Sequence, residues 1–181
     1  VEISKTIKKT VMDNFFLIPS NITLSYFSED YVSHINDKEY ILKKQLSMIC
    51  SDFDYIIIDT PPSKGLITQN ALTAADSVII PLQCEYFAME AITSILALIR
   101  KIKTSTNPNL EIEGFLYTMF DPNDQFQVEI SNEIRNIFGT QIIREGKSTK
   151  ENLYPEVKIS LLVRKRVTPI TNNFVIMTRK L

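Results

Sequence analysis

The feature that most constrains the fold is a short apolar run, Tyr55-Ile-Ile-Ile58, which leads directly into Asp59-Thr-Pro-Pro62. The run is too short for a helix and lacks polar alternation, so it predicts a strand buried on both faces, as in a parallel sheet covered by helices. The two prolines cannot continue the hydrogen-bond ladder. Ligands of open α/β sheets bind beyond the carboxyl ends of the strands, so Asp59 stands where a metal or phosphate site is expected. The alternative is an aspartate that only closes a turn.

Further strands and helices alternate along the chain. Short apolar runs predict strands at 15–19, 77–81, 112–119 and 141–143. Helices are expected at 1–13, 23–34, 35–50, 66–75, 85–103 and 127–138, and the 85–103 segment carries a broad apolar stripe. Alternating strands and helices indicate right-handed crossovers, so we predict an α/β fold with α/β/α layers and a mostly parallel sheet.

The composition is that of a globular protein, with 44% hydrophobic and 23% charged residues and a net charge of −1 over 181 residues. Without a global basic excess, any contact with nucleic acid requires a local patch. Cys50 and Cys84 have no metal-ligand spacing, and we expect both to be reduced, buried thiols of a cytosolic protein. His34 is expected at the surface. The sequence contains no apolar run long enough to span a membrane.

Several collinear segments resemble one protein family. They are Leu17-Ile-Pro-Ser-Asn21, the 55–63 segment that contains Asp59, and segments 70–90 and 113–121. Together they are similar to the ParA/Soj family, the deviant-Walker P-loop ATPases of chromosome and plasmid partitioning. The resemblance runs from about residue 14 to residue 143. It divides the chain into a partial ParA-type P-loop NTPase domain, 1–143, and a divergent C-terminal segment, 144–181.

The resemblance implies an ATP-dependent homodimer that holds ATP and Mg²⁺ at its interface and binds DNA non-specifically. It also implies a ParB-type partner and a cytoplasmic, nucleoid-associated location without membrane attachment. Asp59 matches the Walker B aspartate, which holds the Mg²⁺ shell, usually through water. Thr60, Pro61 and Pro62 match the start of the loop that senses the γ-phosphate. Asp121 matches the position that contacts adenine. No residue is assigned a catalytic role.

One departure from the family concerns the phosphate-binding loop, which we do not find in the sequence. Gly146-Lys-Ser-Thr149 looks like the end of such a loop, but the preceding glycine, Gly139, lies two residues too early for the motif. A solvated turn is therefore the preferred interpretation. We expect no ATP hydrolysis by this chain alone. We also expect open strand edges, which favour aggregation.

The other departure is the C-terminal segment. Residues 154–160 are similar to a nucleotide-contacting turn of the family with one residue missing, and 161–181 match nothing in it. This stretch carries five basic residues: Arg164, Lys165, Arg166, Arg179 and Lys180. Two interpretations of this stretch are open. The favoured one is a reading-frame change or gene decay, and the alternative is a divergent tail that binds DNA or an acidic partner.

Three functional hypotheses remain open. The chain is a portion of a ParA-like ATPase, or it is a non-catalytic interaction module or decayed remnant that binds a partitioning partner or a paralogue. A different P-loop function, such as septum-site positioning or nitrogenase-type reduction, is less favoured. The reason is that the Pro81–Phe87 segment looks like the partitioning branch.

Overall fold

The computed structural model describes residues 2–20, 34–61, 63–139, 142–143, 160–163 and 174–178. The strands are β1 (Lys8–Lys9), β2 (Phe15–Pro19), β3 (Tyr55–Asp59), β4 (Ser77–Leu82), β5 (Glu111–Tyr117), β6 (Ile142–Ile143), β7 (Ser160–Val163) and β8 (Phe174–Thr178). The α-helices are α1 (Ile41–Leu46), α2 (Leu66–Ala74), α3 (Ala88–Ser105) and α4 (Gln125–Phe138). Short 3₁₀ turns lie at Ile3–Thr6, Lys38–Tyr40 and Cys50–Asp52.

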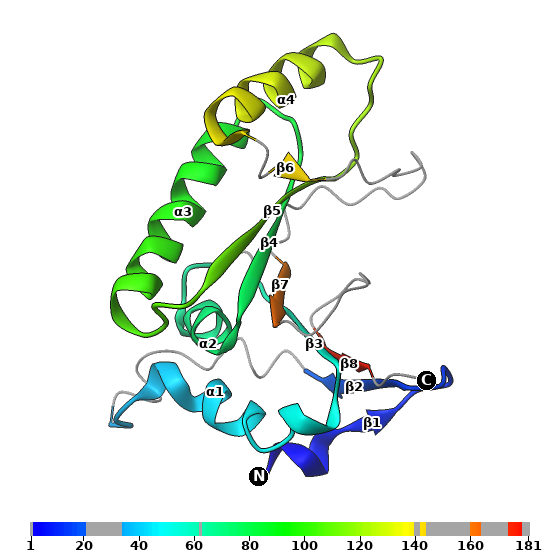
Figure 1. Ribbon diagram of the computed structural model, residues 1–181, viewed down its shortest axis with the longest axis vertical. Helices are drawn as coiled ribbons and strands as arrows, with labels where there is room; N and C mark the ends of the chain where they lie inside the picture. The colour runs from blue at the N-terminus through cyan, green and yellow to red at the C-terminus, as the bar shows by residue number, and fades with distance from the viewer. Residues whose placement is uncertain are drawn as a thin grey trace.

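The strands form two sheets, with helices packed beside them (Figure 1). Sheet A has the order β1-β2-β8-β3-β7, and sheet B has the order β4-β5-β6. Sheet B is parallel, which confirms the α/β class predicted from the alternating pattern. The neighbouring strands of sheet A pair antiparallel.

Most predicted elements are confirmed to within a few residues. The strands expected at 15–19, 55–58, 77–81, 112–119 and 141–143 are β2, β3, β4, β5 and β6, and the helices expected at 66–75, 85–103 and 127–138 are α2, α3 and α4. Helix α3 follows its apolar stripe, because Ile92, Ile95 and Ile99 are buried while Arg100 is exposed. Helix α4 ends before Gly139, in agreement with the predicted range 127–138, and Gly139 combines φ of 64° with ψ of −142°, which only glycine adopts readily.

The helix predicted at 1–13 is wrong. Only Ile3–Thr6 is helical, as a 3₁₀ turn, and β1 then pairs with β2 in a hairpin. Asn14, with φ of 57°, makes the turn, and the Thr10 hydroxyl donates a 2.9 Å hydrogen bond to the Phe15 oxygen. Asparagine tolerates this left-handed conformation, so the turn wins over a marginal helix.

The helix predicted at 35–50 is only partly correct. It starts late, because Asp37 adopts φ of 57°, and it divides into the 38–40 turn, α1 and the 50–52 turn. The sequence predicts an apolar face with Ile41, Leu42, Leu46 and Ile49 for this helix, and Leu46 and Ile49 are indeed buried. The helix predicted at 23–34 lies almost entirely outside the described residues.

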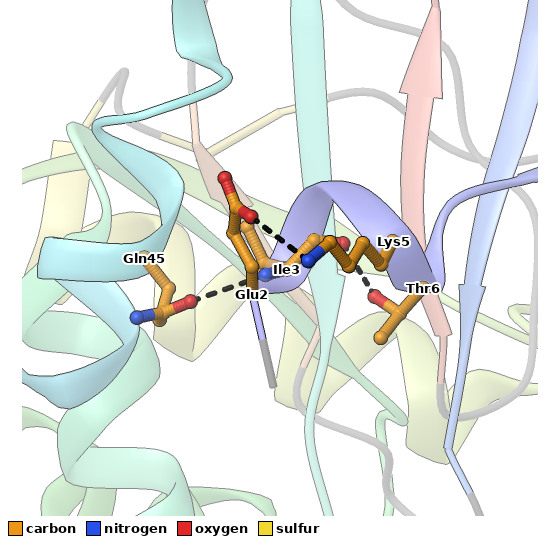
Figure 2. Close-up of polar contacts among 5 residues, drawn as sticks. All are labelled: Glu2, Ile3, Lys5, Thr6 and Gln45. Atoms are coloured by element: carbon orange, nitrogen blue, oxygen red, sulfur yellow. Dashed lines mark hydrogen bonds and ion pairs between the residues drawn. The ribbon is translucent and has the colours of Figure 1, made fainter.

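The amino-terminal turn is attached to α1 rather than free. Figure 2 shows the Ile3 amide donating a 3.2 Å hydrogen bond to Oε1 of Gln45, a residue of α1. Within the turn, the Thr6 hydroxyl donates to the Ile3 oxygen at 2.6 Å, and Lys5 lies 3.6 Å from Glu2. The ion pair is exposed and contributes little. The side-chain-to-amide bond is the contact that docks the turn.

The main core lies between sheet B and α3. Helix α3 contributes Ile92, Ile99 and Ile102, each about 1% exposed, and Phe115 of β5 packs on Phe138 of α4 with ring centroids 5.0 Å apart. Each such side chain contributes roughly 1.5–3 kcal/mol through burial. This packing fixes the carboxyl ends of β4 and β5, where loops gather. None of the helices in the described part of the chain is long and apolar enough to cross a membrane.

Candidate functional site

Strand β3 of sheet A places a carboxylate at its own carboxyl end. Ile56, Ile57 and Ile58 are each at most 4% exposed, whereas Asp59, the last residue of the strand, is half-buried. Thr60 follows at 1% exposure. The apolar residues hold the strand in the interior, and the strand ends because Pro61 has no amide hydrogen to donate. Asp59 therefore lies where the sequence predicted a ligand site.

The loop after Thr60 is fastened to the start of α2. The Ser63 amide donates to the Pro61 oxygen at 2.7 Å, and the Gln69 side chain donates to the Lys64 oxygen at 3.0 Å. Gly65 occupies the N-cap and has no side chain to cap the first amides of the helix. A helix start of this kind favours an anion nearby. Pro62 lies outside the described residues.

The carboxyl ends of β4 and β5 are tied together beside α3. The Thr118 amide donates to the Leu82 oxygen at 2.8 Å, and the Gln83 side chain donates to the Met119 sulfur at 3.4 Å. Met119 has φ of 53°, an unusual conformation for a side chain of this size. Gln83 is not among the residues predicted from the sequence to form a site, although it is a polar residue directly after the apolar strand β4.

Asp121 lies beyond β5, in sheet B, whereas Asp59 ends a strand of sheet A. Oδ1 of Asp121 accepts hydrogen bonds from the amide and the side chain of Asn123 at 3.0 and 3.1 Å. Its own amide donates to Oε1 of Gln127 at 2.9 Å. Asp121 thus shapes the loop that leads into α4. Its predicted contact with adenine stays a prediction.

The carboxylate of Asp59 is of the kind that suits a magnesium ion. Mg²⁺ is commonly held through one or two carboxylates while it keeps several waters. Across the described ranges, no three His, Cys, Asp or Glu side chains gather to hold a metal directly. The Asp59 carboxylate by itself does not fit zinc, which is usually held by several nitrogen or sulfur ligands. It is compatible with the water-mediated role predicted for Asp59.

The two cysteines differ, which corrects the expectation that both are buried. Cys84, after β4, is 2% exposed, and burial raises its pKa from 9.0 to about 11 despite the nearby positive charge of Arg135. Cys50 is exposed because α1 ends before it. Both are free thiols. His34 is exposed, as predicted.

Comparison with known proteins places the chain in a family. Residues 1–112 match the model of an AAA domain family. The chain is 40% identical over 138 residues to the sporulation initiation inhibitor protein Soj of Bacillus subtilis, which covers 76% of this chain and 54% of the relative. The chain spans about half the length of the curated relatives that it matches.

Two solved structures show the same fold. One is cobyrinic acid a,c-diamide synthase from Mycobacterium smegmatis with bound ADP and magnesium, with a TM-score of 0.69 and 35% identity over 77% of this chain and 56% of that one. The other is a plasmid partition protein from Borrelia burgdorferi, with a TM-score of 0.62 and 36% identity over 77% and 55%. The chain belongs to the AAA domain family, and its similarity is to the Soj and ParA partitioning proteins within it.

Proposed function

We propose that this chain binds ATP with Mg²⁺ at the carboxyl end of β3. It thereby serves ATP-gated dimerisation and non-specific DNA binding in chromosome or plasmid partitioning. The observation that carries the proposal is the half-buried carboxylate of Asp59, which is followed by the buried Thr60 at the carboxyl end of a buried strand. Ligands of open α/β sheets occupy this position. The family resemblance assigns the Walker B aspartate to it.

Each residue has a defined role in this proposal. Asp59 orients the waters of the Mg²⁺ shell, and bound Mg²⁺ neutralises phosphate charge. The loop that starts at Thr60, Pro61 and Pro62 lies against the γ-phosphate, and the amino end of α2 favours the negative charge. Asp121 contacts adenine from the loop after β5.

Partitioning is favoured over other functions by the sequence relatives. The similar solved structures carry two different activities in their names, a synthase and a plasmid partition protein, so the shared fold alone does not choose between them. The Soj protein of Treponema pallidum, 37% identical, is named a chromosome-partitioning ATPase. A homodimer, a ParB-type partner and a cytoplasmic, nucleoid-associated location belong to this proposal.

Binding of a fluorescent ATP analogue to the purified full chain, with and without Mg²⁺, tests the nucleotide site. Asp59→Asn should weaken Mg²⁺-dependent binding by about tenfold or more, the usual scale for disrupting a metal shell. Asp54→Asn is the matched control, because Asp54 precedes the same strand at its opposite end. Equal loss in both variants, or no binding by the unsubstituted chain, would overturn the site.

A second experiment separates binding from hydrolysis and DNA contact. We expect no phosphate release from ATP by this chain alone, whereas a non-specific DNA duplex should bind more tightly with ATP than without it. DNA affinity should fall as salt rises, because non-specific binding depends on counterion release. DNA affinity that is indifferent to both ATP and salt would contradict the proposal.

The alternative is a non-catalytic module that binds a partner or paralogue. It is favoured by one observation: Tyr86 and Phe87 are 76% and 68% exposed, with ring centroids 5.0 Å apart. Exposed aromatic residues are enriched at interfaces. A Tyr86→Ser, Phe87→Ser double variant that loses self-association while nucleotide binding is absent in both proteins would support this alternative.

A further inference from the structure

The carboxyl-terminal strands β7 and β8 pair with the two opposite edges of β3. Ile57 of β3 lies opposite Leu162 of β7 on one side and opposite Ile176 of β8 on the other. Both pairings are antiparallel, and both strands come from the single segment 160–178. One segment of the chain therefore supplies both neighbours of β3, whose three central residues are buried.

Strand β8 lies between β2 and β3 in sheet A, and β7 lies on the other side of β3, at the edge of the sheet. Strands β2 and β3 both run antiparallel to β8, so they are parallel to one another, with Leu17 and Ile57 aligned on Ile176. On the other side, β7 lies beside β4 (Figure 1), and β4 follows β3 through the crossover helix α2. In sheets of this kind an antiparallel strand usually lies at the edge. Here β8 lies inside sheet A, whereas β7 is an edge strand of it.

Without these two strands, β3 would have two open edges. Its sequence, Tyr-Ile-Ile-Ile-Asp, is apolar and β-branched, which makes an open edge a template for pairing with another chain. The edge of sheet A that β1 forms is protected by other means, because β1 is only the two residues Lys8 and Lys9. Short, charged strands are a common device at sheet edges.

The sequence around β7 and β8 has the pattern of protected apolar strands. Ser-Leu-Leu-Val of β7 is followed by Arg164-Lys-Arg166, and Phe-Val-Ile-Met-Thr of β8 is followed by Arg179-Lys180. Charged residues that flank unavoidable apolar strands suppress aggregation. The family resemblance leaves the basic residues of this segment unexplained. Protection of the flanked apolar strands against aggregation is a physical reason for them.

We propose that β7 and β8 form an edge-capping clamp, which covers both edges of β3 within one molecule and prevents β3 from pairing with a second copy of the chain. Strand β7 of the clamp extends as far as the proposed nucleotide site, because Ser160 lies opposite Asp59. The sequence predicts open strand edges, and in the structure the clamp covers both edges of β3. The clamp stands independently of nucleotide binding.

Disulfide trapping in the full chain tests the pairing. With Cys50→Ser and Cys84→Ser as background, Tyr55→Cys is combined with Thr178→Cys, and Ile56→Cys with Met177→Cys. Adjacent antiparallel pairs alternate in spacing, so one of the two places the thiols closer together. Ile56→Cys with Val175→Cys, two residues out of register, is the control. Fast intramolecular disulfides confined to a registered pair are expected. Disulfides mainly between molecules, or no preference over the control, would overturn the clamp.

A proline variant tests what the clamp prevents. Ile176→Pro disrupts the β8 ladder between β2 and β3, so we expect a shift from monomer to larger species in light scattering after gel filtration. Lys9→Pro is the matched control, because an edge strand such as β1 tolerates proline. An Ile176→Pro protein that stays folded and monomeric would refute the proposal. If that variant is unfolded, the disulfide pairs decide.

Discussion

The side-chain nitrogen of Asn107 lies 2.7 Å from the main-chain oxygen of Ala75, the C-cap of α2. The same nitrogen donates to the Leu72 oxygen at 3.0 Å. Both bonds are buried, and the last carbonyl groups of a helix have no partner within the helix itself. Asn107, from the turn after α3, therefore closes the helix that follows the Asp59 loop.

Replacing Asn107 with alanine should lower the free energy of unfolding by about 2 kcal/mol, because it leaves two buried carbonyl oxygens without their donor. Urea denaturation followed by circular dichroism measures the change. Asn109→Ala is the control, because Asn109 is exposed in the same turn and should change stability by less than about 0.5 kcal/mol. Equal effects at the two positions would mean that the capping bonds contribute nothing.

A second prediction concerns Asp124, the N-cap of α4. Its Oδ1 accepts hydrogen bonds from the amides of Phe126 and Gln127 at 3.0 and 3.4 Å. Asp124→Ala should cost about 1 kcal/mol in the same denaturation assay. Asp124→Asn keeps a capping oxygen and should retain most of that stability. An asparagine variant as unstable as the alanine variant would show that charge, rather than the cap, matters.

The sequence predicted the elements whose own residues dictate them. The Tyr55–Ile58 run and the apolar stripe of α3 each report burial directly, so β3 and α3 were found with nearly correct bounds. Asp59 was selected as a site residue for the same reason. A polar residue at the end of a buried strand is visible in sequence alone.

The remaining features depend on partners far along the chain. The antiparallel positions of β7 and β8 beside β3 could not be predicted, because an apolar run does not specify which strand it will join. The predicted helix at 1–13 failed because β1 finds a partner in β2. Cys50 was expected to be buried because it follows the apolar Ile49, but α1 ends at Leu46 and Cys50 is exposed.

A third prediction follows from the different exposure of the two thiols. Cys50 should react with an aromatic disulfide reagent at pH 8 in the folded protein, whereas Cys84 should react only after denaturant is added. Counting released thiolate before and after unfolding measures this directly. Cys50→Ser should abolish the reaction of the folded protein. Rapid labelling of Cys84 in that variant would contradict its burial.

The last prediction is a loss of stability at alkaline pH through Cys84. Burial raises its pKa from 9.0 to about 11, so the folded protein keeps the thiol proton to a higher pH than the unfolded chain does. The resulting stability is fully present below pH 9 and is lost progressively as pH rises from 9.0 to about 11.

Cys84→Ala isolates this effect, because the alanine variant lacks the titrating group and its cavity penalty does not change with pH. The difference in unfolding free energy between the unsubstituted protein and this variant should shrink by about 1 kcal/mol between pH 8 and pH 10. Urea denaturation of both proteins at the two pH values provides the measurement. Tyr117 remains in both proteins, and the part of its raised pKa that comes from burial cancels from the difference; the part that comes from the Cys84 charge is removed together with that charge. A difference that stays constant would show that the folded protein ionises Cys84 as readily as the unfolded chain does.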